Sequence, residues 1–240
     1  MSSDAPLWQP VDGRGWMHQA TYRYGSAGVA NATAVRIGEG RLALLSPPGG
    51  AAGPELLDQL GNLGEVTAII APNAFHRSGL PGAAARFPDA ILYAPETALA
   101  RVAAVLPRAP VALQSIRGLP PEVEIFAPPH MARQDTALAL HTPEGTIWTL
   151  HDVVLNMTEI GSNAVDRWVL NRLGYLPGLR LNRFGLRFVL LGDRPAFSRW
   201  LAEALRRDPP AVFAPGHGAV LREPDLAQRM VALAEEIAGI

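Results

Sequence analysis

Short apolar runs separated by glycine and proline occupy the first fifth of the chain, and this pattern is typical of β-strands. The runs that predict strands are 7–11, 16–24, 29–37 and 41–46. Gly38-Glu39-Gly40 lies between the last two runs and predicts a turn that joins them as a hairpin. A Pro/Gly stretch at 47–53 then ends the strand pattern, and the leucines of 54–63 recur on one face of a predicted helix.

Strand and helix patterns alternate in the middle of the chain. The predicted order is a buried strand at 66–70, a helix at 82–86, a strand at 90–94 and a helix at 97–106. The loop between the first strand and its helix is polar and carries Asn73, His76, Arg77 and Ser78. Because α/β proteins place chemistry in loops at the carboxyl ends of buried strands, the rest of the chain is interpreted around this loop.

In the second half of the chain, several predicted strands are followed by a stretch that combines helices with one strand. Strands are predicted at 111–116, 123–127, 136–141 and 146–150, with a hairpin turn at Pro143-Glu144-Gly145. The stretch 153–192 is rich in arginine and glycine and is interpreted as loop and helix. A helix at 193–207, a strand at 212–214 and a helix at 223–237 follow.

This order of elements predicts the fold class α/β (α+β). Two sheets packed face to face, with helices on both outer surfaces, would bury every apolar face, which describes a four-layer αββα sandwich. With no linker-like stretch, residues 1–240 are expected to form a single domain.

Composition limits the classes of partner that the chain is expected to bind. The chain has 21 arginines and no lysine against 22 acidic residues, and no basic run, so neither a nucleic acid nor a membrane is expected as a partner. It contains no cysteine, no apolar run near the length of a membrane span and no signal-peptide pattern at its start. We therefore expect a cytoplasmic protein that acts on a small-molecule substrate, with a homodimer left open.

Histidine and carboxylate residues follow four of the predicted strands. The groups are Asn73-x-x-His76, Pro129-His130, His151-Asp152 and Gly216-His217. Imidazole and carboxylate side chains are natural ligands of a divalent transition metal, and three protein ligands with an open position define a catalytic site.

These loops resemble the metallo-β-lactamase superfamily, whose leading motif is His-x-His-x-Asp-His. The motif positions fall on Ala71, Asn73, Phe75 and His76, so only the last motif ligand is present. By the same resemblance His130 matches the mid-chain ligand, Asp152 the bridging aspartate and His217 the final ligand. The Pro-Asn-x-x-His loop, the Thr-Leu pair shortly before the aspartate and the Gly-His-Gly turn are similar to a branch of the superfamily with a degenerate motif.

The resemblance implies one metal ion rather than two, because alanine and phenylalanine cannot coordinate and an asparagine amide is a poor ligand for zinc. The expected ligands are His76, Asp152 and His217, with His130 as a fourth ligand or a supporting partner. Zinc is the expected ion, iron and manganese are alternatives, and a site without metal stays open. Asp152 and His76 are the candidate catalytic residues.

The same loop supplies candidate substrate-binding residues, namely Asn73, Arg77 and Ser78. His141 and His151 are expected to be structural or to face solvent. The tryptophans expected in the core are Trp148, Trp168 and Trp200.

Three functions remain open from the sequence. The first is a metal-dependent hydrolase acting on an ester, thioester, lactone or phosphoester. The second is a catalytically inactive protein of the same fold that binds a small ligand or a protein. The third is a homodimeric scaffold with an exposed apolar patch in the leucine-rich region 170–191.

Overall fold

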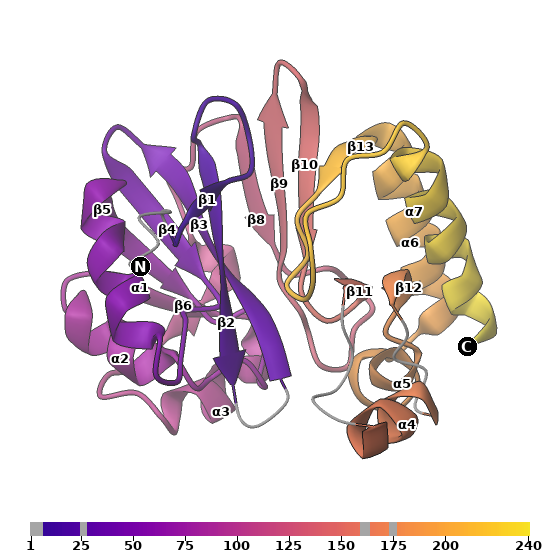
Figure 1. Cartoon of the computed structure of the whole chain (residues 1–240), viewed down its shortest axis with the longest axis horizontal. Coiled ribbons are helices and arrows are strands. Elements are labelled where there is room, and N and C mark those ends of the chain that lie inside the picture. Colours follow the sequence, from indigo (N-terminus) through magenta and orange to yellow (C-terminus); the bar gives the residue numbers. More distant parts are fainter. Residues whose placement is uncertain (1–6, 25–27, 159–163, 173–176) are drawn as a thin grey trace.

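The computed structural model describes residues 7–24, 28–158, 164–172 and 177–240. Two sheets face each other and helices cover the outer surface of each (Figure 1). The predicted four-layer αββα arrangement is therefore confirmed.

The first sheet has strand order β1-β2-β3-β4-β5-β6-β7. Its strands are β1 (Gln9–Pro10), β2 (Met17–Tyr24), β3 (Gly28–Gly38), β4 (Arg41–Leu45), β5 (Glu65–Ile70), β6 (Ile91–Ala94) and β7 (Val111–Ala112). The pairs from β1 to β4 are antiparallel, and those from β4 to β7 are parallel. The predicted hairpin of β3 and β4 is confirmed.

The parallel pairing of β4 and β5 decides where their following loops meet. Leu45 is the register partner of Ile70, and the amide of Ser46 donates to the carbonyl of Ile70 at 3.1 Å. Since both strands end at the same edge, Ser46 lies beside the loop that carries Asn73 and His76.

The second sheet has strand order β13-β10-β9-β8. Its strands are β8 (Val123–Phe126), β9 (Ala137–Thr142), β10 (Gly145–Leu150) and β13 (Pro210–Phe213). β9 and β10 form the predicted hairpin, while β13 pairs with β10 in parallel. That parallel pair brings the loops after Leu150 and Phe213 to one edge.

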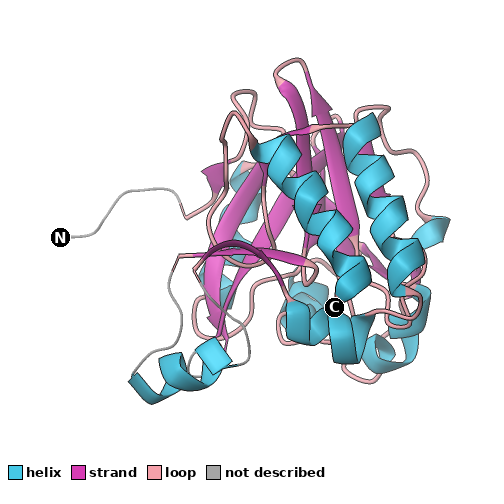
Figure 2. Cartoon of the chain, turned by 90° about the vertical axis from the view of Figure 1, so that its right-hand side faces the viewer, coloured by secondary structure: helices cyan, strands magenta, loops and turns pink. Residues whose placement is uncertain are grey.

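Helices flank the two sheets. They are α1 (Gly53–Gln59), α2 (Leu80–Arg86), α3 (Leu99–Ala103), α4 (Ala164–Arg172), α5 (Arg183–Gly185), α6 (Arg194–Arg207) and α7 (Leu226–Glu236). In α6 the side chain of Asp193 caps the first turn by accepting from the amide of Ala196 at 2.9 Å. α6 and α7 lie side by side over the second sheet (Figure 2).

The period of two along each strand divides the core into layers. In β4, Leu44 packs with α1 and α2, whereas its neighbour Leu45 packs against Leu138 and Ile147 of the second sheet. A third cluster lies between the second sheet and the helices α6 and α7, where Phe197 and Leu201 are fully buried.

The stretch 153–192 differs from its prediction. Besides helix it contains a two-stranded antiparallel sheet of β11 (Val154–Met157) and β12 (Gly178–Leu181). Both strands have four residues, and they lie about twenty residues apart in the chain. The sequence therefore has neither a long alternation of apolar and polar residues nor a short turn from which the pair could be predicted. The strand predicted over 111–116 also ends early, because the chain turns into a 3-10 helix at Leu113–Ser115.

The leucines of the region 170–191 are mostly buried, whereas Phe184 and Phe188 in the same stretch are 41% and 68% exposed. The apolar surface expected there is therefore supplied by phenylalanines rather than by leucines. Leu179, Leu181, Leu186 and Leu190 all lie in the core, and Leu173 and Leu176 fall outside the described residues. Trp148 is buried and Trp200 is half-buried as expected, but Trp168 is 64% exposed on α4 and was wrongly assigned to the core. Within the described part of the chain, no helix is long and apolar enough to span a membrane.

Gly79 lies where the loop after β5 packs closely against the loop after β4. A Cβ atom on Gly79 would lie 2.0 Å from the carbonyl oxygen of Pro47, a backbone atom that has no room to move aside. We expect Gly79→Ala to lower the free energy of unfolding by about 1–3 kcal/mol, measured by urea denaturation. Gly61→Ala is the control, because a Cβ there meets nothing within 4 Å; equal stability losses in both variants would contradict this packing.

Candidate metal centre

Three side chains from distant parts of the chain converge at the edge shared by the two sheets. His76 follows β5, Asp152 follows β10, and His217 follows β13. The Nε2 atoms of the two histidines lie 3.2 Å apart, and Oδ1 of Asp152 lies 3.3 Å from His76 Nε2 and 3.1 Å from His217 Nε2. The expected meeting of these three residues is confirmed, and their ligand atoms form a nearly equilateral triangle.

This triangle fits one face of a tetrahedral metal site. Zinc binds nitrogen and oxygen ligands at about 2.0–2.1 Å, so the ligand atoms of a tetrahedron are separated by about 3.3 Å. The edges of 3.1 to 3.3 Å match that spacing. Two imidazoles and one carboxylate are also a donor set that a divalent transition metal accepts, so the residues present fit one such ion.

The second nitrogen of each histidine is held by the protein. His217 Nδ1 lies 2.7 Å from the carbonyl oxygen of Val29, which accepts only from a protonated nitrogen. His217 therefore carries a proton on Nδ1, and its Nε2 faces the centre, where it can donate to Asp152 when protonated or bind a metal ion when it is not. His76 Nδ1 lies 3.1 Å from Ser46 Oγ, which in turn lies 3.2 Å from the hydroxyl of Tyr22. Such contacts orient metal-binding imidazoles in proteins.

Glycines let the His217 loop approach this edge closely. A Cβ on Gly216 would lie 2.7 Å from the Cα of His151, and one on Gly218 would lie 1.8 Å from the carbonyl oxygen of Asn156. Gly218 also has a φ of +97°, a conformation that favours glycine. The Gly-His-Gly turn is therefore a structural requirement for placing His217.

Asn73 organises the loop and the carboxylate. Its Nδ2 donates to Asp152 Oδ2 at 2.7 Å and to Asp135 Oδ1 at 3.0 Å. Its Oδ1 accepts from the amides of Phe75 at 2.8 Å and His76 at 3.3 Å. Both the nitrogen and the oxygen of the Asn73 side chain are therefore hydrogen-bonded within the protein, and the residue is only 1% exposed. Asn73 supports the site from the protein interior. The structure therefore gives Asn73 a supporting position, and its contact with substrate stays a prediction.

Asp135 is a buried carboxyl group that supports Asp152. Its Oδ2 accepts from the amide of Asp152 at 2.8 Å, and its Oδ1 accepts from Asn73. Burial, followed by the negative charge of Asp152, raises the pKa of Asp135 to about 7. The two donated hydrogen bonds oppose that rise without cancelling it.

The charges at the centre favour an anionic Asp152. Burial by itself would raise the pKa of Asp152, but the charges and hydrogen bonds of His76 and His217 outweigh it and hold the pKa well below its usual range. Burial would lower the pKa of His217, but the hydrogen bond and charge of Asp152 raise it above its usual value. The centre thus pairs a stable anion with His217, an imidazole that readily takes up positive charge.

His151 lies beside the centre without joining it. It is fully buried, its ring centroid lies 5.8 Å from that of His76, and its Nδ1 lies 3.4 Å from the carbonyl oxygen of Thr136. Burial and then the charge of His76 lower the pKa of His151 to about 3, so the ring is neutral. Burial excludes the solvent-facing alternative for His151, and its structural role stays a prediction.

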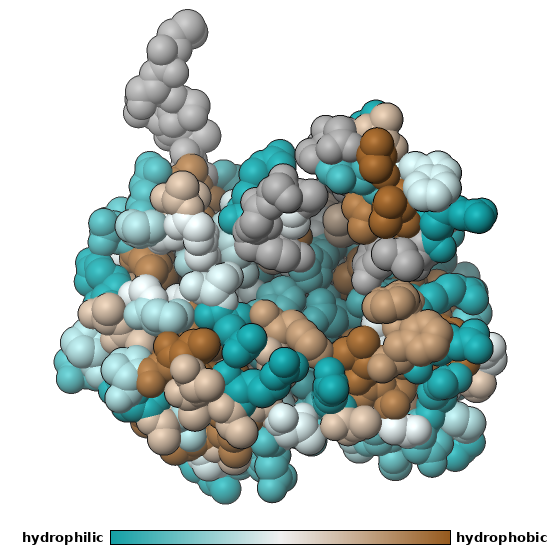
Figure 3. Space-filling model, turned by 90° about the horizontal axis from the view of Figure 1, so that it is seen from below, coloured by the Kyte–Doolittle hydropathy of each residue, from teal (hydrophilic) through white to brown (hydrophobic). Residues whose placement is uncertain are grey.

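The centre opens into a small pocket of about 150 Å³. The pocket is lined by Tyr22, Phe75, His76, Ser78, Asp152 and His217. Phe75 is 45% exposed, and the guanidinium groups of Arg101 and Arg133 lie over its ring, at 5.7 and 5.8 Å from the centroid. Seen from below, the surface is hollowed between the two halves of the molecule, and hydrophilic residues lie on the floor of the hollow (Figure 3).

Two of the residues predicted for the site lie elsewhere. His130 is exposed, and the described residues that converge as a metal-binding group are His76, Asp152 and His217, so the structure does not bring His130 to the centre. Instead the backbone of His130, in a left-handed conformation with φ of 65°, accepts from the amides of Gly192 and Asp193. Arg77 does not line the pocket and donates from Nη1 to the carbonyl oxygen of Arg101 at 3.2 Å, whereas Ser78 does line it.

Sequence reasoning missed Tyr22, Ser46 and Asp135. Ser46 directly follows a strand, as His76, Asp152 and His217 lie shortly after theirs, and that position was its only signal in the sequence. Tyr22 lies within a strand and Asp135 precedes one, and nothing in their local sequence distinguishes them from ordinary strand and turn residues.

Comparison with known proteins supports the fold and goes no further. No protein-family model matches the sequence, and no curated protein sequence matches it. A metallo-beta-lactamase from Pontibacter korlensis superposes with a TM-score of 0.60 at 14% identity, covering 95% of this chain and 98% of its own. DIM-1 metallo-beta-lactamase exposed to ceftazidime gives 0.60 at 17% identity, covering 97% and 98% of the two chains. VMB-1 gives 0.56 at 13% identity, covering 92% and 93%.

Proposed function

We propose that this chain, which has the metallo-β-lactamase fold, is a hydrolase dependent on a single divalent metal ion. The observation that carries the proposal is the triangle of His76 Nε2, Asp152 Oδ1 and His217 Nε2, with edges of 3.1 to 3.3 Å. Zinc is the proposed ion because two imidazoles and one carboxylate suit it. The proposed substrate is a small ester, thioester, lactone or phosphoester. Residues 1–240 are proposed to form the single domain that binds it.

Each side chain around the centre has a proposed task. A bound divalent ion would polarise a carbonyl or phosphoryl oxygen and lower the pKa of a coordinated water toward about 7. Asp152 would remain anionic because of its lowered pKa, which suits a ligand better than a proton acceptor. Burial raises the pKa of Tyr22, so its hydroxyl stays protonated in the pocket wall and can donate a hydrogen bond to substrate.

The position of Phe75 shapes the proposal. This side chain lines the pocket at the position that the motif alignment assigns to an aspartate, and it contributes no ligand. A second ion in the first motif site would also need ligands at Ala71 and Asn73, of which one has none and the other is committed to two carboxylates. These residues support a one-metal centre.

The direct test is metal analysis of protein purified without chelator, followed by hydrolysis assays of the zinc-loaded chain. We expect close to one ion per chain, and turnover of at least one compound from a panel of nitrophenyl esters, thioesters, lactones and phosphoesters. A metal content far below one per chain after reconstitution would contradict the metal centre. Metal bound at one per chain without turnover on the whole panel would instead support the inactive alternative.

Metal binding is also expected to stabilise the fold. Zinc at about 1,000 times its dissociation constant should add about 4 kcal/mol to the free energy of unfolding, because it binds the native site. For a chain of this size that corresponds to a rise in melting temperature of about 8–16 °C. Differential scanning calorimetry with zinc and with EDTA measures the shift, and equal melting temperatures in the two samples would contradict a site that zinc fills.

A second candidate is a catalytically inactive binding protein. The observation that favours it is again Phe75, whose ring replaces a polar group in the pocket and is flanked by the guanidinium groups of Arg101 and Arg133. Such an arrangement suits recognition of an anionic or planar ligand. The hydrolysis panel separates this candidate from the first.

A further inference from the structure

The pocket of the metal centre holds a reacting group and leaves the rest of a substrate outside. Its volume is about 150 Å³, below the roughly 300 Å³ at which small-molecule sites usually begin. Phe75 and Ser78 are the exposed residues of its lining, while the other lining residues are buried or half-buried. The remainder of a larger substrate therefore leaves the pocket past one of these two residues.

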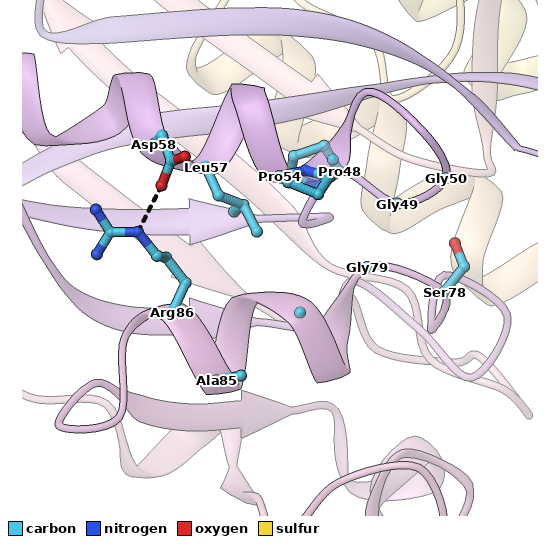
Figure 4. A pocket seen from close by; sticks show the side chains of 12 residues that line it. Pro48, Gly49, Gly50, Pro54, Leu57, Asp58, Ser78, Gly79, Ala85 and Arg86 are labelled. Atoms are coloured by element: carbon cyan, nitrogen blue, oxygen red, sulfur yellow. Dashed lines mark hydrogen bonds and ion pairs between the residues drawn. The ribbon is translucent and has the colours of Figure 1, made fainter.

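The way past Ser78 is closed by the loop after β4. A second cavity, of about 460 Å³, lies beyond Ser78 between helices α1 and α2 (Figure 4). A Cβ atom on Gly49 would lie 2.8 Å from Ser78 Oγ and 3.0 Å from the amide nitrogen of Gly79, so this loop packs directly against both residues. A substrate chain has no room to pass there, and Phe75 marks the open side of the pocket.

Two arginines lie over the exposed ring of Phe75. The guanidinium carbon of Arg101, in α3, lies 5.7 Å from the ring centroid, and that of Arg133, which precedes β9, lies 5.8 Å from it. Both arginines are exposed. A guanidinium group over an aromatic ring keeps its N–H donors in its own plane, where they can still bind an anion.

The segments that carry the two arginines are joined to each other and to the loop of the metal centre. The amide of Gln134, which follows Arg133, donates to Thr97 Oγ1 at 2.8 Å. In return the amide of Thr97, in the turn that leads into α3, donates to Gln134 Oε1 at 3.3 Å. Arg77, in the loop after β5, donates from Nη1 to the carbonyl oxygen of Arg101 at 3.2 Å. The two backbone segments are therefore positioned before a ligand binds, which lowers the entropic cost of binding.

No carboxylate of the described residues neutralises these two cations. Neither Arg101 nor Arg133 forms an ion pair within the described part of the chain, whereas the exposed Arg86 pairs with Asp58 at 2.8 Å. Two like charges held near one ring repel each other, and an anion that contacts both removes this repulsion. The N–H fork of a guanidinium group pairs with the two oxygens of a carboxylate.

We propose that Arg101 and Arg133 bind a carboxylate at the far end of the substrate, which rests on the proposed hydrolase because the carboxylate belongs to its substrate. The scissile ester or thioester group then lies beside His76 and Asp152, and the chain between the two groups crosses the ring of Phe75. The proposed substrates narrow to esters and thioesters that carry a carboxylate away from the bond that is cleaved.

Binding to the metal-free protein tests the two arginines without turnover. Monomethyl adipate and dimethyl adipate have the same chain, and only the first carries a carboxylate. In NMR titrations at low ionic strength, we expect the monomethyl ester to bind at least about threefold more tightly, since it forms two exposed ion pairs. Equal affinity for the two compounds overturns the proposal.

Substitution of each arginine assigns the preference to this site. Arg101→Gln and Arg133→Gln should each weaken binding of monomethyl adipate by about two- to fivefold, as the loss of an exposed ion pair does. Both side chains are exposed, so the variants should fold, which circular dichroism checks. Arg41→Gln is the matched control, because Arg41 is exposed at the start of β4, the opposite end of that strand from the metal centre, and its affinity should not change. A preference for the carboxylate that neither variant reduces overturns the proposal.

The zinc-loaded protein separates this inference from the proposed function. With spontaneous hydrolysis subtracted, we expect mono-4-nitrophenyl adipate to be hydrolysed with a higher kcat/KM than its methyl ester. Arg133→Gln should reduce the ratio of the two values, mainly through KM. Equal kcat/KM for the two esters overturns the carboxylate site and leaves the hydrolase. Binding of monomethyl adipate that the two variants weaken, with no turnover of either nitrophenyl ester, supports the carboxylate site and overturns the hydrolase.

Discussion

Asp152→Asn is expected to weaken zinc binding by more than about 100-fold, because it removes the anionic ligand from one corner of the triangle. The amide retains the size of the carboxylate, so the fold should persist, but its neutral oxygen attracts the cation less. Equilibrium dialysis against buffered zinc, with metal content measured per chain, gives the affinity. Circular dichroism of the same samples establishes that the variant is folded.

His130→Ala is the matched control for this experiment. His130 is a histidine that the sequence assigns to the metal site and that the structure places on the surface, outside the group of His76, Asp152 and His217. Its replacement is expected to leave zinc affinity unchanged within about twofold. Loss of zinc in His130→Ala, or retention of full affinity in Asp152→Asn, would contradict the centre described above.

Asn73→Ala is expected to lower the free energy of unfolding of the metal-free protein by about 1–3 kcal/mol, because two buried carboxyl groups lose a hydrogen-bond donor. The amide of Asn73 is the shared donor between Asp135 and Asp152, and without it the two carboxyl groups face each other with less compensation. The amides of Phe75 and His76 also lose their acceptor, which loosens the loop. Urea denaturation in EDTA at neutral pH measures the change.

The control for Asn73→Ala is Asn62→Ala, since Asn62 is exposed at the end of a 3-10 helix. Its replacement should change the free energy of unfolding by about 0.5 kcal/mol or less. A loss below about 1 kcal/mol in Asn73→Ala would show that the amide is not the structural pivot of the site.

Most of the fold was predictable from local pattern. The strands before Asn73 and Asp152 are apolar runs bounded by glycine, proline or polar residues, and such runs form strands wherever they can be buried on both faces. The sheet of β11 and β12 was not predictable, because its two short strands pair across an intervening helix. Trp168 was wrongly assigned to the core because tryptophan is usually buried, whereas α4 has no buried residue.

The sequence by itself determined the order of the elements and which loops carry imidazole and carboxylate groups, because periodicity and residue chemistry are properties of neighbouring positions. Tertiary structure alone decided which of those groups meet. The parallel pairs β4–β5 and β10–β13 place Ser46, His76, Asp152 and His217 along one edge, while the left-handed turn at His130 directs that histidine away. Asp135 and Asn73 support Asp152 through contacts between residues 17 to 79 positions apart, which no local pattern encodes.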